Sequence, residues 1–189
     1  MHVTPEVARR LEREWGMPVV ADLSYPMGAG EWALVARSVQ RRRTHDVTLF
    51  IPRHGMLAVI RKPSYPLGAW RTPSGGVALG ERFEDGAVRE AWEETGLRVE
   101  PSRYLLRARV TFTRGSERLG WWSHVFQMRY LAGEPHPVDT REVAAARWAD
   151  LAELAGPVDQ ALVNAGSGGF LYRARLQKLV APLLIGGKD

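Results

Sequence analysis

The sequence predicts an α/β fold in which helices pack on a mixed sheet. Strand-like and helix-like segments alternate along the chain, and neither an internal repeat nor a low-complexity tract interrupts them. The 189 residues, 45% hydrophobic and 25% charged, suit one globular domain with extensions. This composition excludes a mainly disordered, collagen-like or coiled-coil protein.

The first elements are expected in the N-terminal third of the chain. Thr4 is placed to cap a helix that ends at Trp15, with Pro5 at its first position. Residues 18–30 contain several turn-forming residues, and residues 32–39 are expected to form a strand. Two further strands, joined by a short turn at 53–55, are expected at 47–52 and 56–61.

The remaining elements follow a loop over 64–76 that is marked by proline and glycine. A helix is expected from Glu84 to Thr95, and Gly96 is placed to end it in a left-handed conformation. Further along, the pattern predicts a hairpin of strands 103–113 and 121–131, a short strand at 147–148, a helical turn at 151–154 and a final helix within 170–184 that Pro182 ends or kinks.

The charge balance points weakly to an anionic partner. The chain has 26 basic and 21 acidic side chains, a formal net charge of +5. This charge suits a phosphate-bearing ligand, but an arginine-rich composition inherited from a GC-rich genome would also explain it. The run Arg41–Arg43 is open in the same way, as a solvated turn or a phosphate contact.

Two absences bear on the expected location. No cysteine is present, which excludes disulfides, thiolate metal sites and cysteine nucleophiles. The first fifteen residues are charged and lack the apolar core of a signal peptide, and no apolar run approaches the roughly 18 residues of a membrane helix. We therefore expect a cytoplasmic protein without a membrane partner.

Acidic side chains gather on one face of the helix expected at 84–95. At helical spacing, Glu90, Glu93 and Glu94 fall within an arc of about 100°, opposite the apolar side. Like charges at this spacing destabilise a helix by a few tenths of a kcal/mol per pair. Either the face is simply solvated, or the carboxylates bind a hard cation such as Mg²⁺, Mn²⁺ or Ca²⁺.

The pattern around this helix favours the cation. Gly75, five residues, Glu81, seven residues and then Arg89-Glu90-Ala91-Trp92-Glu93-Glu94-Thr95-Gly96-Leu97 resembles the Nudix box, G-x5-E-x7-R-E-U-x-E-E-x-G-U, at all seven fixed positions. Weaker similarity extends over residues 44–154. The resemblance implies an α/β/α sandwich with a mixed sheet, to which an N-terminal helical extension and a C-terminal helix are added.

The resemblance also implies an activity and a set of site residues. Nudix hydrolases use divalent metal ions to cleave a pyrophosphate bond in a nucleoside diphosphate linked to another moiety. On the family's pattern, Arg89 would orient the carboxylates, Glu81 would brace Arg89, and the backbone at Gly75 and Gly76 would approach the metal or a phosphate. The implied ligands of Mg²⁺ or Mn²⁺ are Glu90, Glu93 and Glu94. Replacing Glu93 or Glu94 by Gln is expected to abolish activity and leave the fold intact.

Other candidates lie outside the box. In some family members a glutamate on a later loop is the general base or an extra metal ligand, and Glu142 is the candidate here, with an ordinary exposed glutamate as the alternative. Trp70 and Arg71, just before the box, are candidate substrate-binding residues, by stacking and by phosphate contact. For the tryptophans, including Trp121, core packing is the alternative. Lys62 is a further candidate for phosphate contact, and for both Lys62 and Arg71 a solvated side chain is the alternative.

The expected organisation is an N-terminal extension of residues 1–43 packed on a hydrolase domain of residues 44–189. The expected ligand is a small nucleotide-type diphosphate, nucleic acid is not expected as a partner, and a homodimer is compatible with the sequence. Two alternatives stay open: a Nudix-fold nucleotide-binding or regulatory module that does not hydrolyse its ligand, and an enzyme that removes pyrophosphate from RNA 5′ ends, which the positive charge suits.

Overall fold

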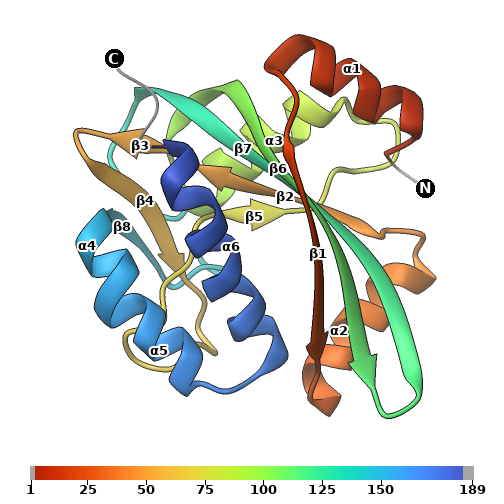
Figure 1. Ribbon diagram of the computed structural model, residues 1–189. Helices are drawn as coiled ribbons and strands as arrows, with labels where there is room; N and C mark the ends of the chain where they lie inside the picture. The colour runs from red at the N-terminus through yellow and green to blue at the C-terminus, as the bar shows by residue number, and fades with distance from the viewer. Residues whose placement is uncertain (1–2, 185–189) are drawn as a thin grey trace.

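The computed structural model describes residues 3–184, whose strands form two sheets (Figure 1). A five-stranded sheet has the order β1-β6-β7-β2-β5, and a three-stranded sheet has the order β3-β4-β8. The strands are β1 Val19–Pro26, β2 His45–Phe50, β3 Pro52–Arg53, β4 Met56–Arg61, β5 Ser74–Gly75, β6 Arg98–Arg114, β7 Glu117–Ala132 and β8 Ala145–Asp150. The helices are α1 Pro5–Trp15, α2 Ala29–Gln40, α3 Phe83–Thr95, α4 Leu151–Glu153, α5 Asp159–Asn164 and α6 Gly168–Leu184, with a π-helical turn over Leu154–Val158.

The larger sheet is mixed, which confirms the predicted α/β class. Strands β6 and β7 form a long antiparallel hairpin, whereas β1 runs parallel to β6 and β2 runs parallel to β7. Short antiparallel pairing adds β5 to β2. We call the segment that contains Gly75 and Gly76 the glycine loop. Because β5 carries Ser74 and Gly75, this pairing fixes the start of the glycine loop against the sheet.

Helices cover both faces of the larger sheet, so the domain has three layers (Figure 1). On one face, Tyr172, Leu176 and Val180 of α6 enter a buried cluster with residues of β6 and β7. On the other face, Leu11 of α1 and Ala91 of α3 enter a second cluster. The apolar side of α3 is therefore buried, and its acidic side is left to face a cavity.

The N-terminal segment differs from the sequence-based expectation. Residues 18–30, expected as a turn region, contain β1, which pairs along its whole length with β6. Residues 32–39, expected as a strand, lie in helix α2, where Trp32 is buried and Val35 and Val39 pack against the core. The turn-forming residues after β1 in fact begin this helix, since Gly28 is its N-cap residue.

Smaller differences concern the strands and turns. The expected pair 47–52 and 56–61 does not form one hairpin, because β2 lies in the larger sheet and only the short β3 pairs with β4. The turn between β6 and β7 is shorter than expected, and α5 was not predicted. The end of α3 is confirmed: Gly96 has φ 67°, and a Cβ there would lie 2.7 Å from the carbonyl oxygen of His136.

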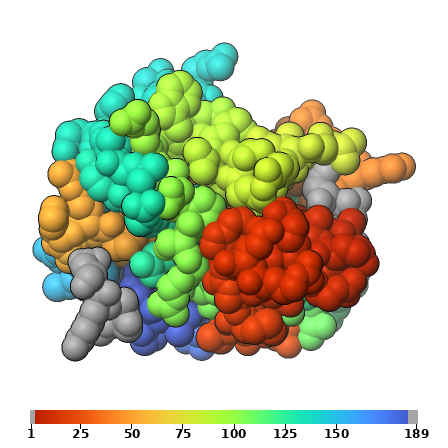
Figure 2. All heavy atoms as spheres, turned by 90° about the horizontal axis from the view of Figure 1, so that it is seen from above, coloured from red at the N-terminus to blue at the C-terminus, as the bar shows by residue number. Residues whose placement is uncertain are grey.

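Helix α1 is tied to α3 by a two-pronged ion pair. Arg10 donates from Nη1 and Nη2 to the two carboxylate oxygens of Glu84, at 2.8 and 2.9 Å. Figure 2 shows α1, in red, as a mass lying on one face of the molecule. The hydrogen bonds from Arg10 lower the pKa of Glu84 to about 2.

This ion pair predicts a specific dependence of stability on pH. A carboxyl whose pKa is lowered by folding stabilises the protein above its ordinary pKa, and this contribution is lost as pH falls from about 5 to about 2. Glu84→Gln should therefore lower the free energy of unfolding by about 2–3 kcal/mol at pH 7, with the difference vanishing near pH 2. Urea unfolding at several pH values measures this, with Glu117→Gln, an exposed carboxylate, as the control. A difference that did not change with pH would contradict the assignment.

No helix within residues 3–184 has the length and apolar character needed to cross a membrane.

Candidate active site

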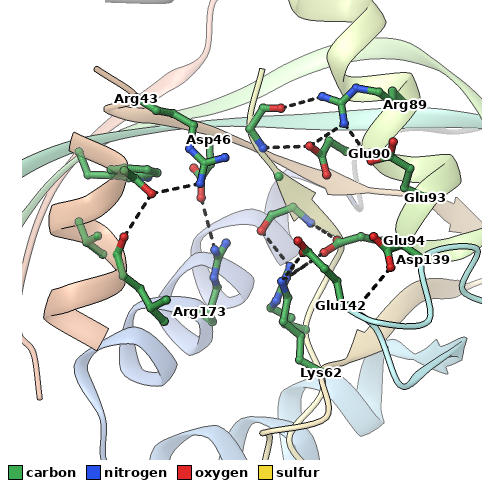
Figure 3. A pocket seen from close by; sticks show the side chains of 18 residues that line it. Arg43, Asp46, Lys62, Arg89, Glu90, Glu93, Glu94, Asp139, Glu142 and Arg173 are labelled. Carbon is green, nitrogen blue, oxygen red and sulfur yellow. Dashed lines mark hydrogen bonds and ion pairs between the residues drawn. The ribbon is translucent and has the colours of Figure 1, made fainter. Parts of the chain in front are cut away.

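The acidic side of α3 borders a cavity of about 480 Å³. Figure 3 shows the side chains of α3 on one side of this cavity, with residues of β2 and α6 on the other. Helix α2, the glycine loop and the loop between β7 and β8 complete the walls. The carboxylates on the cavity are those of Asp46, Glu90, Glu93, Glu94, Asp139 and Glu142.

Arg89 organises the carboxylates of its own helix. Its Nη1 lies 2.9 Å from a carboxylate oxygen of Glu90 and 2.9 Å from one of Glu93. Its Nε donates to Glu81 at 2.8 Å, and its Nη2 donates to the carbonyl oxygen of Gly76 at 2.9 Å. One guanidinium thus fixes two cavity carboxylates relative to the glycine loop.

Glu94 is held by a buried set of donors. Its side chain is 4% exposed and that of Arg71 is 3% exposed, and Nη2 of Arg71 lies 3.1 Å from Oε1 of Glu94. The backbone N–H of Ser74 donates to Oε2 at 2.7 Å. Arg71 also donates to the hydroxyl of Tyr65 and to Ser74, at 2.9 and 2.8 Å. Arg71 is therefore engaged with Glu94 and its surroundings beneath the cavity.

The two glycines of the loop make room for side chains. A Cβ on Gly75 would lie 1.9 Å from the carboxylate of Glu90, and a Cβ on Gly76 would lie 2.3 Å from Nη1 of Arg43. The N–H of Gly76 donates to Glu90 at 3.1 Å. Burial raises the pKa of Glu90 to about 6, and the nearby carboxylates of Glu94 and Glu93 add to the shift.

Glu142 reaches the cavity from the loop between β7 and β8. This loop is fixed to the end of α3, because the N–H groups of Val138 and Asp139 donate to the carbonyl oxygen of Glu93 at 3.0 and 2.9 Å. The Glu142 side chain is 65% exposed and accepts a hydrogen bond from Lys62 at 3.2 Å. Lys62 also lies 3.8 Å from Glu94, so one ammonium group connects the two carboxylates.

The carboxylate oxygens of the cavity suit a hard divalent cation, although they are not arranged around a common point. Within residues 3–184, no three His, Asp or Glu side chains are grouped closely enough to enclose a metal ion. Arg89 and Lys62 pair with the carboxylates instead. The oxygens are nevertheless of the type that Mg²⁺ and Mn²⁺ prefer. The raised pKa of Glu90 further indicates that added positive charge would stabilise its ionised form.

The structure brings most of the sequence-predicted residues to this cavity. Its lining includes Arg71, Gly75, Gly76, Arg89, Glu90, Glu93, Glu94 and Glu142. Trp70 does not line it, and its ring instead packs under Arg147, whose guanidinium carbon lies 4.4 Å from the ring centroid.

Several cavity residues were not identified from the sequence. Asp46 of β2 is buried and pairs with Arg173 of α6 at 3.3 Å, and Asp139 also lines the cavity. Arg43 lines it too, and belongs to the basic run for which the sequence left a phosphate contact open. Asp46 and Arg173 are 127 residues apart in the sequence, so no local spacing links them.

A more apolar hollow of about 380 Å³ opens beside the cavity. The two share Asp46, Trp121 and Arg173. Aromatic rings line much of this hollow, those of Tyr65, Phe112, Trp121, Phe170 and Tyr172. Phe112, Trp121 and Tyr172 belong to the buried core, so the half-buried rings of Tyr65 and Phe170 are the ones that offer stacking to a planar group. We call this hollow the aromatic pocket.

Comparisons with known proteins found a matching family model and similar chains. The family model of the NUDIX domain matches residues 40–168. The chain is 29% identical over 124 residues to an RNA pyrophosphohydrolase of Cereibacter sphaeroides, covering 58% of this chain and 76% of that protein. It is 32% identical over 124 residues to the NAD-capped RNA hydrolase NudC of Stutzerimonas stutzeri, covering 64% of this chain and 42% of that protein. A NUDIX hydrolase structure from Nitrosomonas europaea aligns with TM-score 0.48 and 20% identity over 67% of this chain and 91% of that one.

Proposed function

Because this chain belongs to the Nudix family, and is thus a pyrophosphohydrolase, we propose that it cleaves a pyrophosphate bond in a nucleoside diphosphate linked to another moiety. Nudix hydrolases generally use divalent metal ions, and the proposed ions are Mg²⁺ or Mn²⁺. The proposed ligands are Glu90, Glu93, Glu94 and Glu142.

The observation that carries this proposal is the meeting of two separate acidic segments at one cavity. Three glutamates come from α3, and Glu142 comes from a loop that is hydrogen-bonded to the end of the same helix. Their neighbours Lys62, Arg43 and Arg173 supply positive charge on the same walls. A pyrophosphate group needs both features, because its negative oxygens repel an attacking nucleophile until they are neutralised.

The residues of this chain have distinct roles in the proposed reaction. A divalent cation held there supplies charge neutralisation on phosphate oxygens and a lower pKa for bound water. Arg89 keeps Glu90 and Glu93 in place, and Arg71 does the same for Glu94 from below. Glu142 is the most exposed of the four glutamates, which suits it to accept the proton of the attacking water.

The aromatic pocket supports a nucleotide as the substrate. It adjoins the cavity, so a nucleobase stacked on its rings would place the attached phosphates among the carboxylates and arginines. Trp121 lines both spaces but is also a buried member of the core, which favours core packing for this ring.

A panel of substrates tests the proposed function. We expect turnover of at least one among ADP-ribose, dinucleoside polyphosphates, NADH and the (d)NTPs with Mg²⁺ or Mn²⁺, and loss of turnover with EDTA. Phosphate release after phosphatase treatment measures the reaction. If none is hydrolysed although nucleotides still bind, the chain is instead a binding or regulatory module.

The 5′ end of an RNA is a second candidate substrate, because one relative is named an RNA pyrophosphohydrolase and another a NAD-capped RNA hydrolase. The expectation that nucleic acid is not a partner therefore has no support from the comparisons. Salt separates the two candidates, because binding of RNA along its backbone weakens steeply with salt concentration and binding of a small nucleotide weakens less.

A further inference from the structure

An arginine-lined groove continues from the cavity along helix α2. It has a volume of about 640 Å³ and lies between α2 with the turn that follows it and the loop at Gly76–Ala78. Its charged lining consists of Arg37, Arg41, Arg43, Arg89 and Glu90. Four guanidinium groups thus face one carboxylate, directly beside the acidic cavity. We call this the arginine groove.

Two of these arginines have no protein partner. Most arginines near the cavity are paired, as Arg89 is with Glu81 and Arg173 is with Asp46. Within residues 3–184, by contrast, the side chains of Arg37 and Arg41 make no hydrogen bond, ion pair or ring contact, and both are exposed. Guanidinium groups gathered in this way repel one another, and an anion bound between them would relieve the repulsion.

Contacts at both ends fix the backbone of helix α2, which carries Arg37 and ends just before Arg41. At its start, Glu31 accepts hydrogen bonds from the hydroxyl of Ser167 and the N–H of Gly169, at 2.6 and 3.0 Å, which ties α2 to the beginning of α6. At its end, Arg42 has φ 61°, an unusual value for a residue other than glycine. Nη2 of Arg43 donates a hydrogen bond to the hydroxyl of Ser38 at 3.1 Å, and the Arg43 side chain lies next to Gly76.

The lining of the groove is charged and contains no ring on which a base could stack. No aromatic residue lines it, whereas the aromatic pocket lies on another side of the cavity. A guanidinium group binds phosphate oxygens through two parallel N–H donors, which makes arginine suited to successive phosphates.

We propose that the arginine groove is a second anion site, which binds phosphate groups of the substrate beyond the pyrophosphate that occupies the cavity. The ligand class is an oligophosphate chain. The identity of the cavity as the site of cleavage rests on the proposed function, but binding of phosphate in the groove does not depend on catalysis.

Direct binding of inorganic tripolyphosphate, measured by calorimetry in EDTA, tests the groove alone. Without a divalent cation the acidic cavity repels this ligand, so binding reports the arginines. We expect the double variant Arg37→Gln/Arg41→Gln to bind tripolyphosphate about five- to tenfold more weakly than the unchanged protein. The matched control is Arg13→Gln/Arg98→Gln, which removes the same charge from exposed sites outside the groove and should bind normally.

Three outcomes of the tripolyphosphate measurement would overturn the proposal. These are no binding of tripolyphosphate to the unchanged protein, equal binding by the groove variant, and equal weakening in the control, which would point to net charge alone. The proposal would also be overturned if the groove substitutions weakened binding of an RNA oligomer with a 5′ hydroxyl as much as they weakened binding of tripolyphosphate. The groove would then bind a phosphodiester backbone. Circular dichroism and Tm verify that both variants fold.

A kinetic arm separates this proposal from the proposed function. With Mg²⁺, the groove variant should lower kcat/KM for a dinucleoside polyphosphate about fivefold more than for ADP-ribose, which has no further phosphate to place. If no nucleotide is hydrolysed while tripolyphosphate binding still requires Arg37 and Arg41, the proposed function is contradicted and the groove remains an anion site. If the groove variant hydrolyses both substrates with an unchanged ratio of kcat/KM and binds tripolyphosphate normally, only the proposal of a second anion site is contradicted.

Discussion

Glu93→Gln is expected to reduce kcat by about 10³-fold or more with any metal and substrate that the protein accepts. The substitution removes one negative charge from the cavity and preserves the size of the side chain. The fold should not change, because the Glu93 side chain is 38% exposed and Arg89 keeps its contacts with Glu81 and Glu90. Initial rates at saturating substrate, together with Tm, measure both effects.

The control for this variant is Glu117→Gln, which removes an exposed carboxylate at the start of β7. It should have the activity of the unchanged protein. Normal turnover by Glu93→Gln would contradict the proposed role of the α3 carboxylates. A fall in Tm large enough to unfold the variant at the assay temperature would indicate that the substitution acts through the fold.

Glu94→Gln is expected to behave differently, because Glu94 is part of a buried ion pair. The sequence alone predicts that this variant keeps its fold, but the structure places Arg71 at 3.1 Å from Glu94 with both side chains almost inaccessible to solvent. Removing the carboxylate leaves a buried guanidinium without its counter-charge, which typically costs about 3–5 kcal/mol. We therefore expect loss of activity together with a large fall in the free energy of unfolding.

A double-mutant cycle tests this coupling. Arg71→Met alone should destabilise the protein by a similar amount, because it leaves the Glu94 carboxylate buried. The double variant Arg71→Met/Glu94→Gln should be more stable than the sum of the two single effects, by about 1–3 kcal/mol, and should remain inactive. Urea unfolding measures the coupling. Strictly additive effects would show that Arg71 does not position Glu94.

Glu93 and Glu94 show which features of the site can be predicted from residues close together in the sequence. Helical periodicity alone places Glu90, Glu93 and Glu94 on one face of α3, because side chains three and four residues apart are neighbours on a helix. The same reasoning cannot show that Glu94 is buried beneath the face and Glu93 is at its edge. That difference comes from the loop over 64–76, which brings Arg71 and Ser74 under the helix.

The N-terminal segment shows a second limit. Pro26, Gly28 and Gly30 suggested a turn region followed by a strand, yet the chain forms β1 and then α2. The spacing of Trp32, Val35 and Val39 is compatible with one face of a helix, and these are the residues of α2 that face the protein interior. The strand is decided by β6, which offers a parallel partner to every residue of β1.

The family, the α/β class, helix α3 with its glycine end and the acidic face of that helix could all be predicted from the amino-acid sequence, because each depends mainly on local patterns in the chain. Which charged groups share the cavity could be seen only in the folded chain. Asp46, Arg173, Glu142 and Arg43 come from separate elements, and Arg71 is directed to Glu94 rather than outward. Such pairings depend on how strands and helices pack across the sheet, and no local spacing encodes them.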